Sequence, residues 1–287
     1  MTGYGDAIMK IGTCVKGENL ISELPSIIEH GFETVEVYFD RGLSGIDLVS
    51  LAKKAAEISE NKVSFSSIGI YVNPLQSSEQ RHEVENCIDC AAMFGAGVVS
   101  TFAGAIEGAS VPESIGTFKA VFDELTERAE YNGVKIGIEN AHSTGFWYRA
   151  TNNIGFCPGA WELMFDAVNS NSLGLTWEPS HQIDVYSQLE DWTDKIVHVH
   201  GKDGKIDTEH VKKYGAWFGQ HYCNHRFPGF GDSDWTRIMG KLKESGYEGD
   251  IVIEGFHDPE YRGEREMEGQ LLALDYLKKC RKMSDKI

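Results

Sequence analysis

Two histidines, a lysine and an aspartate stand close together at the end of a short apolar run, IVHVHGKD, at positions 196–203. Side chains alternate between the two faces of a β-strand, so His198, His200 and Lys202 share one face. Imidazole is a common metal ligand. A surface strand could carry such a row without any function, so its meaning depends on what the neighbouring strands place beside it.

Three other apolar runs end in carboxylates. KIGIEN contributes Glu139, LGLTWEPSH contributes Glu178 and His181, and DIVIEG contributes Glu254. Three glutamates and one histidine form a mixed oxygen and nitrogen set that suits Mn²⁺, Co²⁺, Mg²⁺ or Zn²⁺ in a site with open positions. Buried carboxylates this close repel each other and raise their pKa values, and a divalent cation removes that repulsion. The pattern predicts a divalent metal site, with His198 more as a hydrogen-bonded neighbour than as a ligand.

The elements that must bring these residues together are eight strand-like runs, separated by helical patterns. The runs cover positions 8–15, 34–39, 62–72, 98–104, 135–140, 173–180, 196–203 and 250–255. The helical patterns cover positions 20–30, 46–60, 79–94, 112–132, 234–245 and 266–282. Repeated strand–helix alternation predicts a parallel sheet of the α/β class. Eight units in one chain of this length predict a single (β/α)8 TIM barrel over residues 1–287, whose active site lies at the carboxyl ends of the strands. A doubly wound open sheet is the alternative, but no GxGxxG follows the first run.

The overall charge narrows the class of partner. The chain has 287 residues with 27 Lys and Arg against 44 Asp and Glu, a net charge of −17. An acidic surface repels phosphate backbones, so we expect no nucleic-acid partner. The first residues do not read as a signal peptide, and no apolar stretch reaches the length of a membrane span. We therefore expect a soluble cytoplasmic protein with no membrane partner.

Six cysteines are scattered along the chain, and only Cys87 and Cys90 are close, in CIDC. A redox pair or a zinc site is one interpretation. The surrounding residues have a helical pattern, however, and no second CxxC completes a zinc site, so we favour an ordinary helix.

Five segments resemble the xylose isomerase-like TIM barrels, the sugar phosphate isomerase/epimerase superfamily. These segments are IGIEN, EPSH, HVHGKD, RFPGFGDSDW and DIVIEG, and the resemblance spans essentially the whole chain. The superfamily includes ketose 3-epimerases, hydroxypyruvate isomerase, inosose isomerases and dehydratases and, more distantly, endonuclease IV. The motifs are specific for the superfamily and not for a substrate.

The resemblance implies roles at numbered positions. The metal ligands fall on Glu139, Glu178, His200 and Glu254. The second of these departs from the family, which usually has an aspartate three residues before a histidine, so Glu178 would have to bind with a side chain one methylene longer. The catalytic carboxylates fall on Glu139 and Glu254, on opposite sides of the substrate.

Further residues are expected to contact the substrate. By resemblance, His181 and Arg226 touch substrate oxygens, and Lys202 and Asp203 are polar groups of the pocket. Glu36 alternates with two valines on its strand and points either to the barrel mouth or into a buried ion pair. Two aromatic groups are expected to stack on the sugar, cover it or pack on the rim: Phe146, Trp147 and Tyr148 after the fifth run, and Trp217, Phe218, Tyr222 and Phe227 in the long irregular stretch before position 234.

The implied chemistry is proton transfer next to a ketose carbonyl. A metal ion would polarise the carbonyl, one carboxylate would remove the α-proton, and the second would return a proton, which gives an epimerase or an isomerase. A dehydratase or lyase on a keto-sugar or inosose would use the same residues. An endonuclease IV-like phosphodiesterase needs more His and Asp ligands and a basic groove, and a non-catalytic sugar-binding barrel is the remaining alternative. We expect a small sugar as the partner, neutral because no Lys/Arg/Gly cluster marks a phosphate site. A homo-oligomer stays open, since relatives are often dimers or tetramers.

Overall fold

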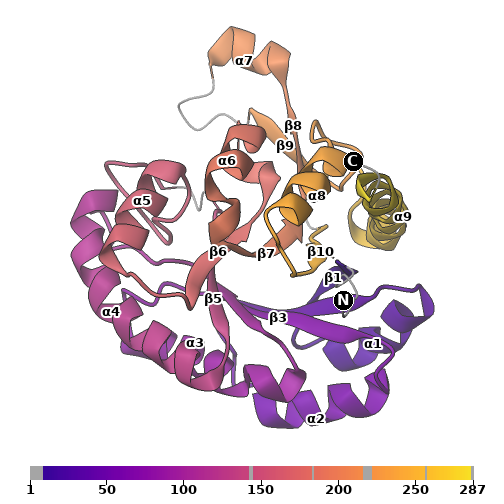
Figure 1. Cartoon of the computed structure of the whole chain (residues 1–287), viewed down its shortest axis with the longest axis horizontal. Helices are drawn as coiled ribbons and strands as arrows, with labels where there is room; N and C mark the ends of the chain where they lie inside the picture. Colours follow the sequence, from indigo (N-terminus) through magenta and orange to yellow (C-terminus); the bar gives the residue numbers. More distant parts are fainter. Residues whose placement is uncertain (1–8, 142–144, 183, 216–221, 256, 286–287) are drawn as a thin grey trace, which may run out of the picture.

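Eight parallel strands close into a barrel in the order β1–β2–β3–β4–β5–β6–β7–β10 (Figure 1). The computed structural model describes residues 9–141, 145–182, 184–215, 222–255 and 257–285. The barrel strands are β1 (Ile11–Lys16), β2 (Thr34–Asp40), β3 (Ser64–Tyr71), β4 (Val98–Thr101), β5 (Lys135–Glu139), β6 (Leu173–Trp177), β7 (Ile196–Gly201) and β10 (Ile251–Ile253). Each of the eight predicted runs overlaps one of them, so the predicted (β/α)8 barrel is confirmed.

Helices surround the barrel, as the arc from α1 to α5 in Figure 1 shows. They are α1 (Leu20–Glu29), α2 (Leu48–Ser59), α3 (Ser78–Phe94), α4 (Val111–Asn132), α5 (Pro158–Ala167), α6 (Val185–Trp192), α7 (Thr208–Tyr214), α8 (Trp235–Glu244) and α9 (Glu266–Ser284). The six helices expected from the sequence are present within a few residues. Clear end signals helped: α4 starts with a capping box between Ser110 and Glu113 and ends at Gly133, which has a φ of +69°. Helices α5, α6 and α7 were not predicted. With 8 and 7 residues, α6 and α7 have too few turns for a clear apolar stripe.

The segment between β7 and α8, expected to be irregular, instead contains a small antiparallel sheet. Strand β8 (Asp203–Ile206) pairs with β9 (Cys223–Arg226), and α7 between them stands away from the barrel (Figure 1). Trp217 and Phe218 lie outside the described residues. Phe227 is fully buried, and a Cβ on Gly255 would lie 2.2 Å from its ring, so this aromatic packs in the core and does not cover a sugar.

The CIDC motif lies inside α3, as the helical interpretation predicted. Cys87 is fully buried and both cysteines are free thiols. Burial raises the pKa of the Cys87 thiol, so it stays protonated and unreactive. None of the helices in the described part of the chain is both long and apolar enough to cross a bilayer.

Candidate metal centre and active site

Four ligand-type side chains converge at the carboxyl ends of neighbouring barrel strands. Glu139 ends β5, His200 lies on β7, and Glu178 and Glu254 directly follow β6 and β10. All four are buried, and their ligand atoms lie within 4.8 Å of one another. The Nδ1 atom of His200 is 3.1 Å from Oε1 of Glu139, 3.2 Å from Oε2 of Glu254 and 3.6 Å from Oε2 of Glu178. The four predicted ligand positions therefore form one cluster, and the longer side chain of Glu178 still reaches it.

Two of the carboxylates each leave one oxygen without a hydrogen bond. Oε1 of Glu178 accepts hydrogen bonds from Ser180 Oγ and lies 2.8 Å from Nε2 of His181. Oε1 of Glu254 accepts from Nζ of Lys202 at 2.6 Å. Oε2 of each glutamate is buried and has no hydrogen-bond partner in the described structure, yet it faces Nδ1 of His200.

A buried acceptor without a partner costs about 1–3 kcal/mol, and more when it is charged. Two such oxygens, the carboxylate of Glu139 and one imidazole nitrogen form a hard donor set around one point. This set fits a divalent cation such as Mn²⁺ or Mg²⁺, which oxygen ligands and an imidazole can share with open positions for substrate.

The electrostatics of the cluster favour added positive charge. Burial raises the pKa of Glu139 to about 6, and the charges of Glu254 and Glu178 add to the rise, against an opposing effect of His200. Burial alone would lower the pKa of His200, but the charge of Glu36 and the close carboxylates of Glu139, Glu178 and Glu254 hold it well above its usual value. The carboxylates thus attract either a proton on His200 or a cation.

Two buried asparagines hold the backbone that carries the glutamates. The side chain of Asn140 donates to the carbonyl of Glu178 at 2.9 Å and accepts from its N–H at 2.8 Å. Asn153 donates to the carbonyls of Glu139 and Ala141 at 2.9 and 3.0 Å. The side-chain oxygen of Asn153 accepts hydrogen bonds from two more backbone N–H groups, each at 3.0 Å. Asn153 could not be recognised from the sequence, because it lies in a loop without a periodic pattern.

We expect Asn153→Ala to lower the free energy of unfolding by about 3 kcal/mol. Four backbone groups around the fully buried side chain would lose their partner, and each such loss is costly. Urea denaturation followed by circular dichroism measures the change, with the exposed Asn169→Ala as the matched control. A loss below about 1 kcal/mol would mean that water or a small shift of the loop replaces these bonds.

The residues expected to touch substrate are not all at the cluster. His181 and Lys202 contact it through Glu178 and Glu254, at 2.8 and 2.6 Å. Glu36 is fully buried and lies on the other side of His200 from the glutamate cluster, 3.3 Å from Nε2. Of the two orientations expected for Glu36, the structure has the buried ion pair.

Arg226, Asp203 and Trp147 have other partners. Arg226 is ion-paired with Asp258 at 3.0 Å and with Glu260 at 3.1 Å. The fully buried carboxylate of Asp203 accepts from two backbone N–H groups, at 2.8 and 3.2 Å, and from the indole of Trp235 at 3.1 Å. Trp147 is 41% exposed, next to the first turn of α5. Substrate contact by these three remains a prediction, and for Asp203 the geometry indicates support of the loop before α8.

A row of three imidazoles lies beside the cluster. The ring centroids of His181 and His225 are 5.0 Å apart, and those of His225 and His257 are 6.0 Å apart. Glu178, His181 and His225 are also close enough to form a second group of possible ligands. Burial, aided by the charge of Lys202, lowers the pKa of His225 to about 3, so its ring is neutral. His257 has a φ of +80°, a strained conformation that is often found at functional sites.

Sequence reasoning assigned no role to His225 or His257. His225 lies on β9, and its place near the site depends on the hairpin that was not predicted. The position of His257, three residues after Glu254, is a sequence signal that places it near the same end of the barrel.

A barrel with its polar side chains at the carboxyl ends of the strands is the architecture of many enzymes, and comparison with known proteins narrows the class. The chain belongs to the xylose isomerase-like TIM barrel family, whose model matches residues 26–280. The inosose dehydratase of Clostridium perfringens is 25% identical over 189 residues, which are 63% of this chain and 57% of that protein. The chain spans about half the length of the curated relatives it matches.

Solved structures share the fold over almost the full length. The 3-keto-D-glucoside 4-epimerase of E. coli is 18% identical with a TM-score of 0.69, over 95% of this chain and all of that one. A xylose isomerase-like TIM barrel protein of Mycobacterium smegmatis in complex with magnesium is 13% identical with a TM-score of 0.71, over 98% of each chain. At these identities the likeness shows the fold alone.

Proposed function

We propose that this protein is a divalent-metal-dependent sugar isomerase or epimerase that moves the proton next to the carbonyl of a ketose. The observation that carries the proposal is the pair of buried, unpartnered carboxylate oxygens of Glu178 and Glu254 that face Nδ1 of His200. Membership of the xylose isomerase-like family supports it.

Glu139, Glu178, Glu254 and His200 would hold the cation, which when bound supplies Lewis acidity to a substrate carbonyl and its neighbouring hydroxyl. Glu139 would remove the proton α to the carbonyl, and Glu254 would return a proton, on the other face for an epimerase or at the adjacent carbon for an isomerase. The ammonium of Lys202, bonded to Glu254, would stabilise negative charge that develops on substrate oxygen. His181, whose Nε2 lies 2.8 Å from Glu178, would orient a sugar hydroxyl through its other ring nitrogen.

The charge of the site favours a neutral sugar. Three carboxylates are balanced by one divalent cation together with Lys202, which leaves no spare positive charge beside the cluster. Arg226 is already paired with two carboxylates. We infer that the substrate is an uncharged ketose.

We therefore expect phosphorylated ketoses to be poorer substrates. Their kcat/KM should be lower than that of the matching free sugar by at least about tenfold, because burial of an anion without a cationic partner costs several kcal/mol. Paired assays with ketoses and their phosphates measure the ratio. A preference for the phosphate would contradict the charge argument and would point to Arg226 leaving its carboxylate partners.

Proton exchange in D₂O tests the proposed reaction. The Mn²⁺-loaded protein is incubated with a panel of ketoses, and NMR follows deuterium incorporation. Deuterium at C3 with inversion would identify an epimerase, and deuterium at C1 with an aldose product an isomerase. The absence of metal-dependent exchange in every sugar, with no other product, would leave the sugar-binding barrel as the better description.

A dehydratase is the second candidate, favoured by the likeness to an inosose dehydratase over 63% of this chain. The same proton abstraction would then be followed by loss of a β-hydroxyl as water. The product mass separates the two, because isomers keep the substrate mass and a dehydratase product is lighter by one water.

A further inference from the structure

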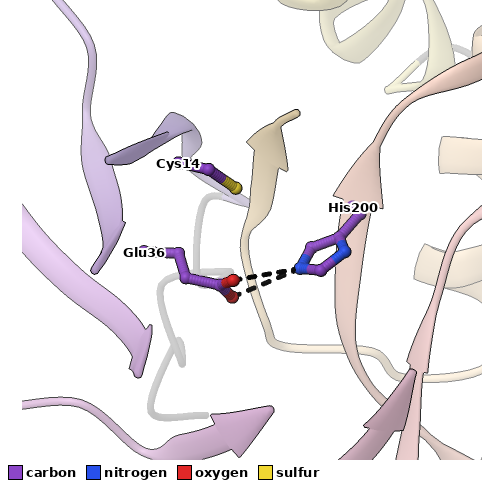
Figure 2. Close-up of side chains that lie close together, drawn as sticks. All are labelled: Cys14, Glu36 and His200. Carbon is purple, nitrogen blue, oxygen red and sulfur yellow. Dashed lines mark hydrogen bonds and ion pairs between the residues drawn. The ribbon is translucent and has the colours of Figure 1, made fainter. Parts of the chain in front are cut away.

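Glu36 lies inside the barrel and points across it to His200. Its strand neighbours in register are Cys14 on β1 and Ser67 on β3. Figure 2 shows the Glu36 carboxylate directed at the ring nitrogen of His200, with the thiol of Cys14 nearby. The nitrogen it faces is Nε2, whereas Nδ1 faces the glutamate cluster. Glu36 therefore contacts a candidate metal ligand from the side opposite to the glutamate cluster.

The carboxylate of Glu36 is itself held firmly. Oε1 accepts from the hydroxyl of Tyr71 at 2.8 Å, and Oε2 accepts from the hydroxyl of Ser67. Nε2 of His198 lies 3.1 Å from Oε2. Room for this group depends on Gly69, where a Cβ would lie 2.7 Å from Oε1 of Glu36. Two hydroxyls and an imidazole thus contact the Glu36 carboxylate, and a glycine leaves the room that it occupies.

The hydrogen-bond chemistry of the pair fixes the histidine. Both oxygens of Glu36 are 3.3 Å from Nε2 of His200, and a carboxylate can only accept. Nε2 must therefore carry a hydrogen. Nδ1 faces the carboxylates of the cluster in the same way, 3.1 Å from Oε1 of Glu139, so the Nδ1 proton is the one that a cation would displace, and the freed lone pair would then face the cation. A ring turned over would place the C–H of Cδ2, and the other tautomer an N–H, where a cation would need a ligand.

We propose that Glu36 is a positioning residue that orients His200, with its Nε2–H on Glu36 and its Nδ1 towards the candidate metal centre. The inference rests on the proposed metal-dependent function. It assigns to Glu36 no contact with substrate, in place of the substrate role expected from the sequence.

Cys14, Glu36 and His200 offer an alternative, because their ligand atoms also lie within 4.8 Å of one another and could hold a thiophilic cation. Two observations argue against it. The oxygens of Glu36 already accept from Tyr71 and Ser67. Burial and the charge of Glu36 raise the pKa of Cys14 well above its usual value, so the thiol stays protonated. A second cation is therefore an outcome that the experiment must be able to reveal.

The first measurement is metal affinity. Calorimetric titration of Mn²⁺ into chelator-treated Glu36→Ala should give a Kd about 10- to 100-fold higher than wild type, the usual effect of removing such a partner of a ligating histidine. Glu36→Gln should restore most of the affinity, because its amide oxygen can still accept from Nε2–H. The control is Glu33→Ala, which removes a carboxylate paired with Arg281 near the start of β2 and should lower stability without changing the Kd.

The second measurement shows directly which nitrogen of the His200 ring is protonated and which binds metal, and it does not depend on activity. Long-range ¹H–¹⁵N NMR of histidine-labelled, Zn²⁺-loaded protein should show His200 protonated at Nε2 and metal-bound at Nδ1, assigned with His200→Gln. Glu36→Gln should keep this pattern, and Glu36→Ala should lose it. If Glu36→Ala does not fold, the double variant Tyr71→Phe with Ser67→Ala takes its place. It keeps the Glu36 carboxylate but removes the two hydroxyls that hold it. Its spectrum should show His200 in a mixture of the two protonation patterns.

Two results would overturn the proposal. One is an unchanged Kd and an unchanged His200 pattern in Glu36→Ala. The other is binding of two Zn²⁺ ions per chain, of which Cys14→Ser removes one. Failure of the proposed function itself looks different, because the wild-type protein would then bind no cation at all.

Discussion

Glu254→Gln should reduce the rate of deuterium exchange into the best ketose substrate by about 10³- to 10⁴-fold. The change removes the negative charge from a buried carboxylate that we assign to both cation binding and proton transfer, and general acid–base catalysis alone contributes 10²- to 10⁴-fold. Glutamine has nearly the same shape, so the fold should persist. The rate is measured by NMR in D₂O at saturating Mn²⁺, so that weaker metal binding does not limit it.

The matched control is Glu248→Gln. Glu248 is an exposed carboxylate shortly before β10, the strand that Glu254 follows, so this change should leave the rate unchanged. A Glu254→Gln protein that keeps more than about a tenth of the wild-type rate would remove Glu254 from the proton-transfer pair. Glu139 would then need another partner, and Lys202 and the row of three imidazoles are the groups to test next.

Lys202→Met should lower kcat by about 10²- to 10³-fold while metal affinity stays within about tenfold of wild type. Lys202 is buried, bonded to Glu254 at 2.6 Å and 3.9 Å from Glu178. Burial alone would lower the pKa of Lys202, but the charges of these glutamates raise it, so the ammonium remains charged across the neutral range. Loss of one preorganised charge or donor next to a developing oxyanion typically has an effect of this size.

Lys205→Met is the control for this prediction, since Lys205 is an exposed lysine on β8, shortly after Lys202 in the chain. The comparison separates two roles for Lys202. If kcat is unchanged and only the Kd for Mn²⁺ rises, Lys202 serves to hold Glu254 in place and takes no part in stabilising the reacting oxygens.

The barrel could be predicted from the sequence because its signals are local and repeated. The strands are buried, mostly apolar runs, and α4 has both a capping box and a terminal glycine. The hairpin of β8 and β9 gave no such signal. Its strands have 4 residues each, and a long connection separates them in the chain. They contain polar residues: Asp203 and Arg226 are opposite each other in the strand register.

The convergence of Glu139, Glu178, His200 and Glu254 could also be predicted, because the carboxyl ends of barrel strands meet at one level and each residue follows or ends its own strand. Which atom of each residue faces the centre could not be predicted. The orientation of His200 depends on Glu36, 164 positions earlier in the chain, and on the hydroxyls of Tyr71 and Ser67 that hold Glu36. Such long-range hydrogen bonds leave no periodic trace in a single sequence.

The measurement that most directly tests the account is a calorimetric titration of Mn²⁺ into chelator-treated protein. We predict one ion per chain, with binding strongly weakened in both Glu139→Gln and Glu254→Gln and unchanged in Glu248→Gln. If wild-type protein binds no ion, or if the two cluster variants bind as tightly as wild type, these carboxylates are only a polar barrel mouth. The proposed proton-transfer chemistry would then lack its electrophile.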